Sequence, residues 1–341
     1  MTVEPDDVFV SWLPLYHDMG LIGAWLGSLY YGTPIAMMSP LQFIVRPESW
    51  LWAIHRYRGT VTAAPNFAYE LCLQNIGDAM IEGLDLSSLR LAVSGAEPVS
   101  ASTLRRFSAR FAKFGFDANA LAPSYGLAEN TVGLTCSPPG RGMITDRIDR
   151  SALDRDGKAV PASATDANAV EIVACGRPLP GHQVRILDAT GREAPDRQEG
   201  SLQFRGPSAT QGYLNSDAQT RALFDDSWLN TGDLGYFADG DVFLTGRNKD
   251  LIIRAGRNIH PHEIEDLIGD IQEIRKGGVV VFGSADKGSG TERIIVAAET
   301  EVVDPAALEE LRRKTSTAAN DVLGMPPDAI VFVPPDSIPK T

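Results

Sequence analysis

The stretch SWLPLYHDMGLIG, residues 11–23, places a histidine and a carboxylate at the end of an apolar, strand-like run. His17 and Asp18 are followed by residues 19–45, which contain no charged residue and are numerous enough to cross a bilayer. Glycines and prolines interrupt this segment at positions 20, 23, 27, 32, 34 and 40. We therefore expect a buried helix to about Tyr31, a turn and a buried strand near residues 35–38, rather than a membrane span.

Strand-like and helix-like patterns alternate around this stretch up to about residue 136. Strands are expected at residues 8–13, 60–64 and 89–95, and helices at 46–58, 65–77 and 100–116. In the last of these helices Leu104, Phe107, Phe111 and Phe114 recur at helical spacing, with basic residues between them. Such alternation predicts the α/β class, with a mainly parallel sheet covered by helices.

The pattern changes after residue 136. Residues 137–170 are polar and rich in small and helix-breaking residues, which indicates an insertion or a long surface loop. Residues 171–246 favour a small, barrel-like β-rich subdomain, in which Asp239-Gly240 is a strong hairpin signal. Residues 251–341 predict a small α+β domain with a short hairpin at 251–258, helices from Pro261 and over 305–323, and strands at 278–283, 293–299 and 329–333.

Composition and charge exclude some functions. The chain has 341 residues and a formal net charge of −13, so nucleic acid is an unfavourable partner. Cys72, Cys136 and Cys175 are far apart and show no CxxC spacing. They predict reduced thiols of a cytoplasmic protein and no cysteine-based metal site. The first residues, MTVEPDD, are acidic and do not form a signal peptide.

Four stretches in this order resemble the adenylate-forming ligase superfamily: LPLYHDMG (13–20), PSYGLAEN (123–130), NTGDLGYF (230–237) and GRNKDLIIRAGRNIHPHEIE (246–265). Within it, SGAEPVSASTLRRF (94–107) and CGRPLPG (175–181) resemble the fatty acyl-AMP ligases. Residues 137–170 are similar to the insertion of that branch. The resemblance covers essentially the whole chain. It implies a partial α/β nucleotide- and acyl-binding subdomain over residues 1–170, a β-rich subdomain over 171–246, a hinge at 247–250 and an incomplete C-terminal domain over 251–341.

The resemblance implies a reaction in which a fatty-acid carboxylate attacks the α-phosphorus of ATP. Pyrophosphate leaves, and the acyl-adenylate then passes its acyl group to the thiol of an acyl carrier protein or polyketide synthase. Because the acid is already ionised at neutral pH, no general base is required. The protein must instead position the reactants in line and stabilise phosphate charge, with ATP and Mg²⁺ as cofactors.

The second of these stretches and SGAEP (94–98) carry the residues that the resemblance assigns to the metal and the adenine. Glu129 corresponds to the Mg²⁺ ligand, and a carboxylate suits this hard cation. Tyr125 corresponds to the aromatic residue that packs on adenine, and Ser124 and Gly126 on either side of it are also assigned to the nucleotide site. Ala128 stands where many relatives have a threonine. Gly95, Ala96 and Glu97 follow a strand end, where open α/β sheets bind ligands, and correspond to the residues along the edge of the base.

Asp233 corresponds to the acceptor for both ribose hydroxyls, because a carboxylate offers paired oxygens to two donors. Arg247 corresponds to a ribose or phosphate contact, and Lys249 and Asp250 fall at the domain hinge. His17 is similar to the residue beside the reacting carboxylate, with Asp18 orienting it or capping the next helix, whose apolar residues would line an acyl tunnel. The ligase interpretation requires His17, Glu129 and Asp233 to face one crevice. Each of these residues also has a purely structural interpretation as a turn, cap or surface residue.

Two motifs of the superfamily do not occur in the sequence: the YTSGSTG-type phosphate loop and the lysine of a Gly-Lys pair beyond IPKT (338–341). The expectation is therefore an internal portion of a ligase that is weakly active or inactive alone. An acyl-CoA ligase and a non-catalytic nucleotide- or acyl-binding remnant remain as alternatives. Arg312, Arg313 and Lys314 form either a docking site for an acidic carrier or a solvated helix face.

Overall fold

The computed structural model describes residues 3–254, 257–285 and 292–339 and has the predicted α/β architecture. A seven-stranded sheet has the order β2-β1-β3-β4-β5-β6-β9, in which the pairs from β2 to β5 are parallel and those of β6 are antiparallel. Its strands are β1 (Phe9–Ser11), β2 (Ile35–Met37), β3 (Val61–Ala64), β4 (Leu91–Ser94), β5 (Leu121–Tyr125), β6 (Thr135–Cys136) and β9 (Arg177–Pro178). The strands predicted at residues 8–13, 60–64 and 89–95 are therefore confirmed.

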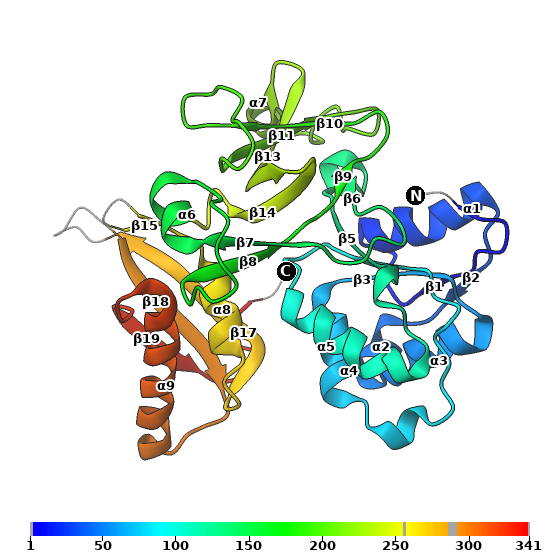
Figure 1. Cartoon of the computed structure of the whole chain (residues 1–341), viewed down its shortest axis with the longest axis horizontal. Coiled ribbons are helices and arrows are strands. Elements are labelled where there is room, and N and C mark those ends of the chain that lie inside the picture. Colours follow the sequence, from blue (N-terminus) through cyan, green and yellow to red (C-terminus); the bar gives the residue numbers. More distant parts are fainter. Residues whose placement is uncertain (1–2, 255–256, 286–291, 340–341) are drawn as a thin grey trace.

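The helices between β2 and β5 pack on one face of the sheet (Figure 1). They are α2 (Pro40–Val45), α3 (Glu48–Tyr57), α4 (Asn66–Asn75) and α5 (Ala101–Phe111), with short 3₁₀ turns η2 (Asp78–Ile81), η3 (Ala112–Phe114) and η4 (Ala118–Ala120). Leu104, Phe107 and Phe111 are buried, as their spacing predicted. The indole nitrogen of Trp50 donates a hydrogen bond of 3.0 Å to Thr62 on β3, which fixes α3 against the sheet.

The apolar segment after His17 forms a π-helix, η1 (Met19–Leu26), that continues as α1 (Gly27–Tyr31). The predicted helix is confirmed, but its predicted burial is wrong at the C-terminal end, where Leu29, Tyr30 and Tyr31 are exposed. Within the residues that the structure describes, no helix is both long enough and apolar enough to span a membrane. The start of η1 needs a glycine, because a Cβ on Gly20 would lie 2.3 Å from the carbonyl oxygen of Pro14.

Residues 137–170 are folded, so their interpretation as a long surface loop is wrong. The antiparallel pair β7 (Thr145–Asp149) and β8 (Ala169–Val173) encloses helix α6 (Arg150–Asp156). Ile148 and Leu153 are buried in a cluster with Tyr236 and Phe243, whose rings are stacked. Buried apolar residues of this mostly polar segment, Ile148 and Leu153 among them, therefore anchor it to the β-rich part of the chain.

The β-rich part is an antiparallel sheet in which β10, β11, β13 and β12 follow one another and β14 also pairs with β13. Its elements are β10 (Gln183–Leu187), β11 (Gly200–Arg205), α7 (Asp217–Leu223), β12 (Phe224–Asp225), β13 (Trp228–Ala238) and β14 (Asp241–Arg247). Asp239 and Gly240 have φ values of 53° and 81°, the left-handed conformation of a tight hairpin turn. The hairpin between β13 and β14 is therefore confirmed.

The C-terminal part follows a short turn after β14 and has the predicted α+β pattern. Its elements are β15 (Ile252–Arg254), β16 (Arg257–Ile259), α8 (Pro261–Gly269), β17 (Ile274–Ala285), β18 (Glu292–Thr300), α9 (Pro305–Leu323) and β19 (Ala329–Val333). The turn predicted between β15 and β16 falls on residues 255–256, which lie outside the described residues, as do Lys340 and Thr341.

Arg312, Arg313 and Lys314 each form an ion pair with a nearby glutamate, as expected for a solvated helix face.

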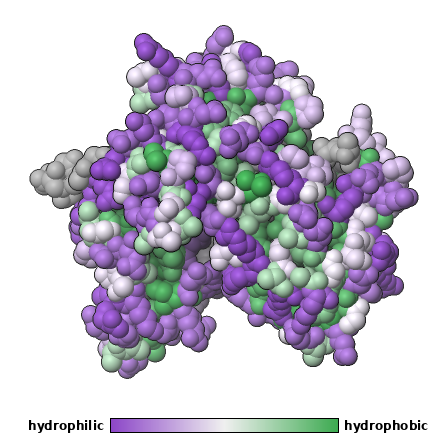
Figure 2. Space-filling model, in the orientation of Figure 1, coloured by the Kyte–Doolittle hydropathy of each residue, from purple (hydrophilic) through white to green (hydrophobic). Residues whose placement is uncertain are grey.

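The α/β, β-rich and C-terminal parts form three lobes (Figure 1), and the surface between the two lower lobes is hollowed (Figure 2). Ion pairs connect α6 to the C-terminal lobe: Arg150 contacts Glu263, and Asp154 lies 2.9 Å from Arg257.

Burial raises the pKa of Glu263 to about 7, although Arg150 opposes this shift. Each lobe has its own hydrophobic cluster, and the domain boundaries stay a prediction.

The close approach at Gly20 yields a test of the fold. Gly20→Ala should destabilise the chain by about 1–3 kcal/mol, because the new methyl group would collide with the backbone at Pro14. Gly23→Ala on the same helix is the matched control, since its Cβ would meet only Val132 at 3.8 Å. Urea denaturation measures both variants, and equal stabilities would contradict this packing.

The raised pKa of Glu263 predicts a pH dependence of stability. Between about pH 4.5 and pH 7 the folded chain retains a proton on Glu263 that the unfolded chain has released. The contribution of Glu263 to the free energy of unfolding therefore declines as the pH rises through this window. Glu263→Gln should flatten the profile in this window by on the order of 2 kcal/mol. The exposed Glu301→Gln serves as control. Parallel profiles for the wild type and Glu263→Gln would show that the carboxyl titrates normally.

Candidate functional site

A cavity of about 1490 Å³ lies at the carboxyl ends of the parallel strands, where all three lobes contribute to its walls. His17, Glu129 and Asp233 all line it, so the predicted common crevice is present. Of the other residues predicted for the site, those that also line the cavity are Gly95, Ala96, Glu97, Ser124, Tyr125, Gly126, Arg247 and Lys249. Asp250 does not line it. It lies in the exposed turn after β14, where its amide donates to the carbonyl of Arg247 over 3.1 Å.

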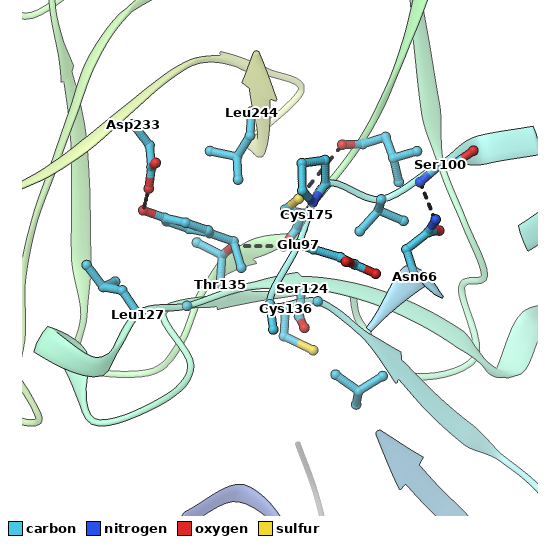
Figure 3. A pocket seen from close by; sticks show the side chains of 18 of the residues that line it. Asn66, Glu97, Ser100, Ser124, Leu127, Thr135, Cys136, Cys175, Asp233 and Leu244 are labelled. Carbon is cyan, nitrogen blue, oxygen red and sulfur yellow. Dashed lines mark hydrogen bonds between the residues drawn. The ribbon is translucent and has the colours of Figure 1, made fainter. Parts of the chain in front are cut away.

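Asp233 on β13 is held by groups from two other strands. The hydroxyl of Tyr125, at the end of β5, donates to its Oδ2 (Figure 3), and the Nε of Arg247 lies 3.4 Å from its Oδ1. Arg247 reaches it because the register of β13 and β14 places the two residues opposite each other. Burial raises the pKa of Asp233, and the Tyr125 hydrogen bond works against that shift. The carboxylate therefore has donors around it and faces the cavity.

Glu97 lies across the cavity from Asp233, in the turn after β4 (Figure 3). Its Oε1 accepts the backbone N–H of Phe67, and burial raises its pKa. Ala96 has a φ of 69°, which is uncommon for a residue with a side chain and often marks a functional turn. A Cβ on Gly95 would lie 2.8 Å from the carbonyl oxygen of Ser124, so packing against β5 already explains this glycine.

Glu129 lies in η5 (Ala128–Asn130), directly after β5. Its Oε1 accepts a hydrogen bond from the hydroxyl of Tyr213, and its carbonyl accepts the backbone N–H of Thr210 over 2.7 Å. Neither partner was predicted from the sequence, because nothing in TQGYLN (210–215) marks them and 84 residues separate Tyr213 from Glu129. Gly126 keeps this loop compact, since a Cβ there would lie 1.8 Å from the carbonyl oxygen of Val132.

His17 and Asp18 occupy the mouth of the cavity at the start of η1. The Nδ1 of His17 lies 2.9 Å from Oδ1 of Asp18, and the same carboxylate accepts the N–H of Met19 over 2.6 Å. Asp18 therefore both contacts the histidine and caps the helix, the two alternatives that the sequence left open. Half of the His17 side chain is exposed.

A further part of the cavity wall is mostly apolar, although the ion pair of Asp7 and Arg90 also lines the cavity there. Phe9, Val61, Ala63, Leu91 and Val93 line it from the face of β1, β3 and β4 that the connecting helices leave uncovered. Met19, Gly23 and Gly27 line it from the helix after His17. The cavity thus has a carboxylate-containing polar part and a mostly apolar wall, which we call the apolar trough.

A divalent metal ion fits Glu129 in chemical terms. Its carboxylate lines the cavity, and one of its oxygens accepts a hydrogen bond from the hydroxyl of Tyr213. Mg²⁺ prefers oxygen ligands of this kind. Within the described part of the chain, no group of three or more histidine, cysteine or acidic side chains could hold a metal. An ion at Glu129 would therefore take its other ligands from phosphate oxygens and water.

Comparisons with known proteins identify relatives of this chain. The AMP-binding enzyme family profile matches residues 1–214. A putative ligase of Mycobacterium tuberculosis is 37% identical over 98% of this chain and 62% of its own length. A medium-chain-fatty-acid–[acyl-carrier-protein] ligase of Teredinibacter turnerae is 36% identical over 99% of this chain and 55% of its own.

The solved structures of fatty acyl-adenylate ligases from E. coli and L. pneumophila include a chain with a TM-score of 0.93 and 37% identity. That alignment covers 99% of this chain and 60% of the solved chain. The chain thus spans between about half and two-thirds of the length of the proteins it matches.

Proposed function

Because the chain belongs to the AMP-binding enzyme family, we propose that its cavity binds a fatty acyl-adenylate and takes part in ATP-dependent activation of a fatty acid. One observation carries this proposal: His17, Glu129 and Asp233, from three distant parts of the sequence, line one cavity that also has an apolar trough. Polar groups for a nucleotide and apolar walls for an alkyl chain match the two halves of an acyl-adenylate.

In the proposed reaction a carboxylate oxygen of the fatty acid attacks the α-phosphorus of ATP. A new P–O bond forms while the bond to the bridging oxygen breaks, and its electron pair leaves with pyrophosphate. In the second step a thiolate attacks the acyl carbon, AMP leaves and a thioester remains. The fatty acid is ionised at neutral pH, so the protein's work in the first step is to orient the reactants and stabilise charge.

The nucleoside end of the proposed site is built around Asp233. Its carboxylate would accept hydrogen bonds from both ribose hydroxyls in place of the hydrogen bond from Tyr125 and the ion pair with Arg247, since one carboxylate can serve two neighbouring donors. Tyr125 would then pack on the adenine. The turn from Gly95 to Glu97, together with Ser124 and Gly126, would border the base, and Arg247 would contact ribose or phosphate.

The phosphate end of the proposed site contains Glu129 and His17. Glu129 would hold Mg²⁺, which neutralises phosphate charge when bound. His17, half exposed at the mouth of the cavity, would donate a hydrogen bond to the carboxylate or phosphate oxygens. The backbone N–H of Met19 donates to Nδ1 of His17 over 3.2 Å, so Nε2 would be the ring nitrogen that donates.

The proposed acceptor is the thiol of an acyl carrier protein or polyketide synthase, because one similar protein is named an acyl-carrier-protein ligase. Lys249 and Asp250, in the exposed turn between β14 and β15, would be the hinge about which the C-terminal lobe moves between the two steps. CoA is the alternative acceptor, and loss of acyl-adenylate on addition of CoA alone would favour it. The free thiols of Cys72, Cys136 and Cys175 support a cytoplasmic location.

Binding of a non-hydrolysable acyl-adenylate analogue tests the proposed site. Isothermal titration with dodecanoyl sulfamoyl adenosine should show binding that Asp233→Asn weakens by about 10- to 100-fold, because hydrogen bonds to a charged acceptor are lost. Asp239→Asn, in the exposed hairpin turn, is the matched control and should bind like the wild type. Equal weakening in both variants, or no binding by the wild type, would contradict the proposal.

The acyl trough generates a separate test. Gly23→Leu would place a branched side chain on the cavity wall, beyond the ordinary contact that a Cβ makes there with Val132. We expect the affinity for a hexadecanoyl analogue to fall about tenfold or more, with little change for an acetyl analogue. Gly23→Ala is the control, because its Cβ would meet only Val132 at 3.8 Å. A uniform loss across chain lengths would show that Gly23 lies outside the acyl path.

A further inference from the structure

The loop that carries Glu129 is fastened to residues 208–213 through its residues 129–131. The amide of Thr210 donates to the carbonyl of Glu129 over 2.7 Å, and the hydroxyl of Thr131 donates to the carbonyl of Ser208 over 2.8 Å. The hydroxyl of Ser208 donates to the side chain of the buried Asn130 over 3.1 Å. These contacts join two segments that lie nearly 80 residues apart in the chain.

Two further contacts stiffen this junction. The side-chain amide of Asn130 donates to the carbonyl of Gly133 over 2.7 Å, which closes the loop on itself. The Nε2 of His182 lies 2.7 Å from the hydroxyl oxygen of Ser208, so a third segment supports the junction. The backbone around Glu129 is therefore fixed without any contribution from the side chain of Tyr213.

Tyr213 acts on the carboxylate itself. Its hydroxyl donates to Oε1 of Glu129, and its ring is 39% exposed, so it contributes little to a hydrophobic core. A glutamate side chain has three rotatable bonds, and an isolated one samples many rotamers. A hydrogen bond to one carboxylate oxygen selects among these rotamers and leaves the second oxygen for another partner.

We propose that Tyr213 is a positioning residue that orients the Glu129 carboxylate toward a divalent metal ion on the phosphates, with residues 208–213 as its rigid support. The inference rests on the proposed function of Glu129. Outer-shell hydrogen bonds to metal ligands fix ligand orientation, and their removal commonly weakens metal binding 10- to 100-fold. Tyr213 therefore governs metal affinity, whereas the nucleoside contacts at Asp233 are independent of it.

The test measures metal binding in the 341-residue chain. Mn²⁺ serves as an electron paramagnetic resonance probe for Mg²⁺ and is titrated in the presence of ATP, without fatty acid. Tyr213→Phe should weaken the protein-bound Mn²⁺–ATP signal about tenfold, while metal-free binding of dodecanoyl sulfamoyl adenosine and the melting temperature stay unchanged. Tyr57→Phe, an exposed tyrosine on α3, is the matched control, and Glu129→Gln should abolish the Mn²⁺ signal.

The outcomes separate the inference from the proposed function. Loss with Glu129→Gln and an unchanged Mn²⁺ affinity with Tyr213→Phe would overturn the role of Tyr213 and leave the metal site in place. A Mn²⁺ signal that does not depend on Glu129 would overturn both the role of Tyr213 and the proposed metal site at Glu129. A tenfold loss accompanied by a lower melting temperature or weaker analogue binding would show that Tyr213 is a structural support of the loop, which also overturns the inference.

Discussion

The hydrogen bond from Tyr125 to Asp233 is the contact on which the site depends. It joins the end of the parallel sheet to the β-rich part across 108 residues of sequence. It satisfies a carboxylate whose burial raises its pKa, and an unpaired buried carboxylate would be costly. The same contact defines one wall of the cavity. A ligand with two vicinal hydroxyls can replace the protein donors there without leaving a buried charge unsatisfied.

The chemistry of the cavity follows from how the sheet is covered. Connecting helices bury one face of β1, β3 and β4, and the other face stays available as an apolar wall. Polar turns at the carboxyl ends of the strands add His17, Glu97 and Glu129 beside that wall. The turns at the strand ends supply the polar side chains of the cavity, as is usual for ligand sites of open α/β sheets. The strands themselves supply the apolar side chains, because every second residue of a strand points to the same face.

Local patterns in the sequence predicted the elements well, and contacts between distant segments much less well. Helix spacing identified α5 and α9, and Asp239-Gly240 identified the hairpin, because each signal lies within a few residues. The exposure of Tyr30 and the role of Tyr213 depend on which segments pack nearby, which no local pattern records. The motif around Glu129 predicted the cavity only because a family resemblance supplied the long-range arrangement.

A crystal structure of the chain with AMP and Mg²⁺ would test the central claim most directly. The account predicts both ribose hydroxyls within hydrogen-bonding distance of the Asp233 carboxylate, with the hydroxyl of Tyr125 displaced from it and the phosphate on the side of Glu129. A nucleotide bound elsewhere on the molecule, with the bond between Tyr125 and Asp233 intact, would contradict the account.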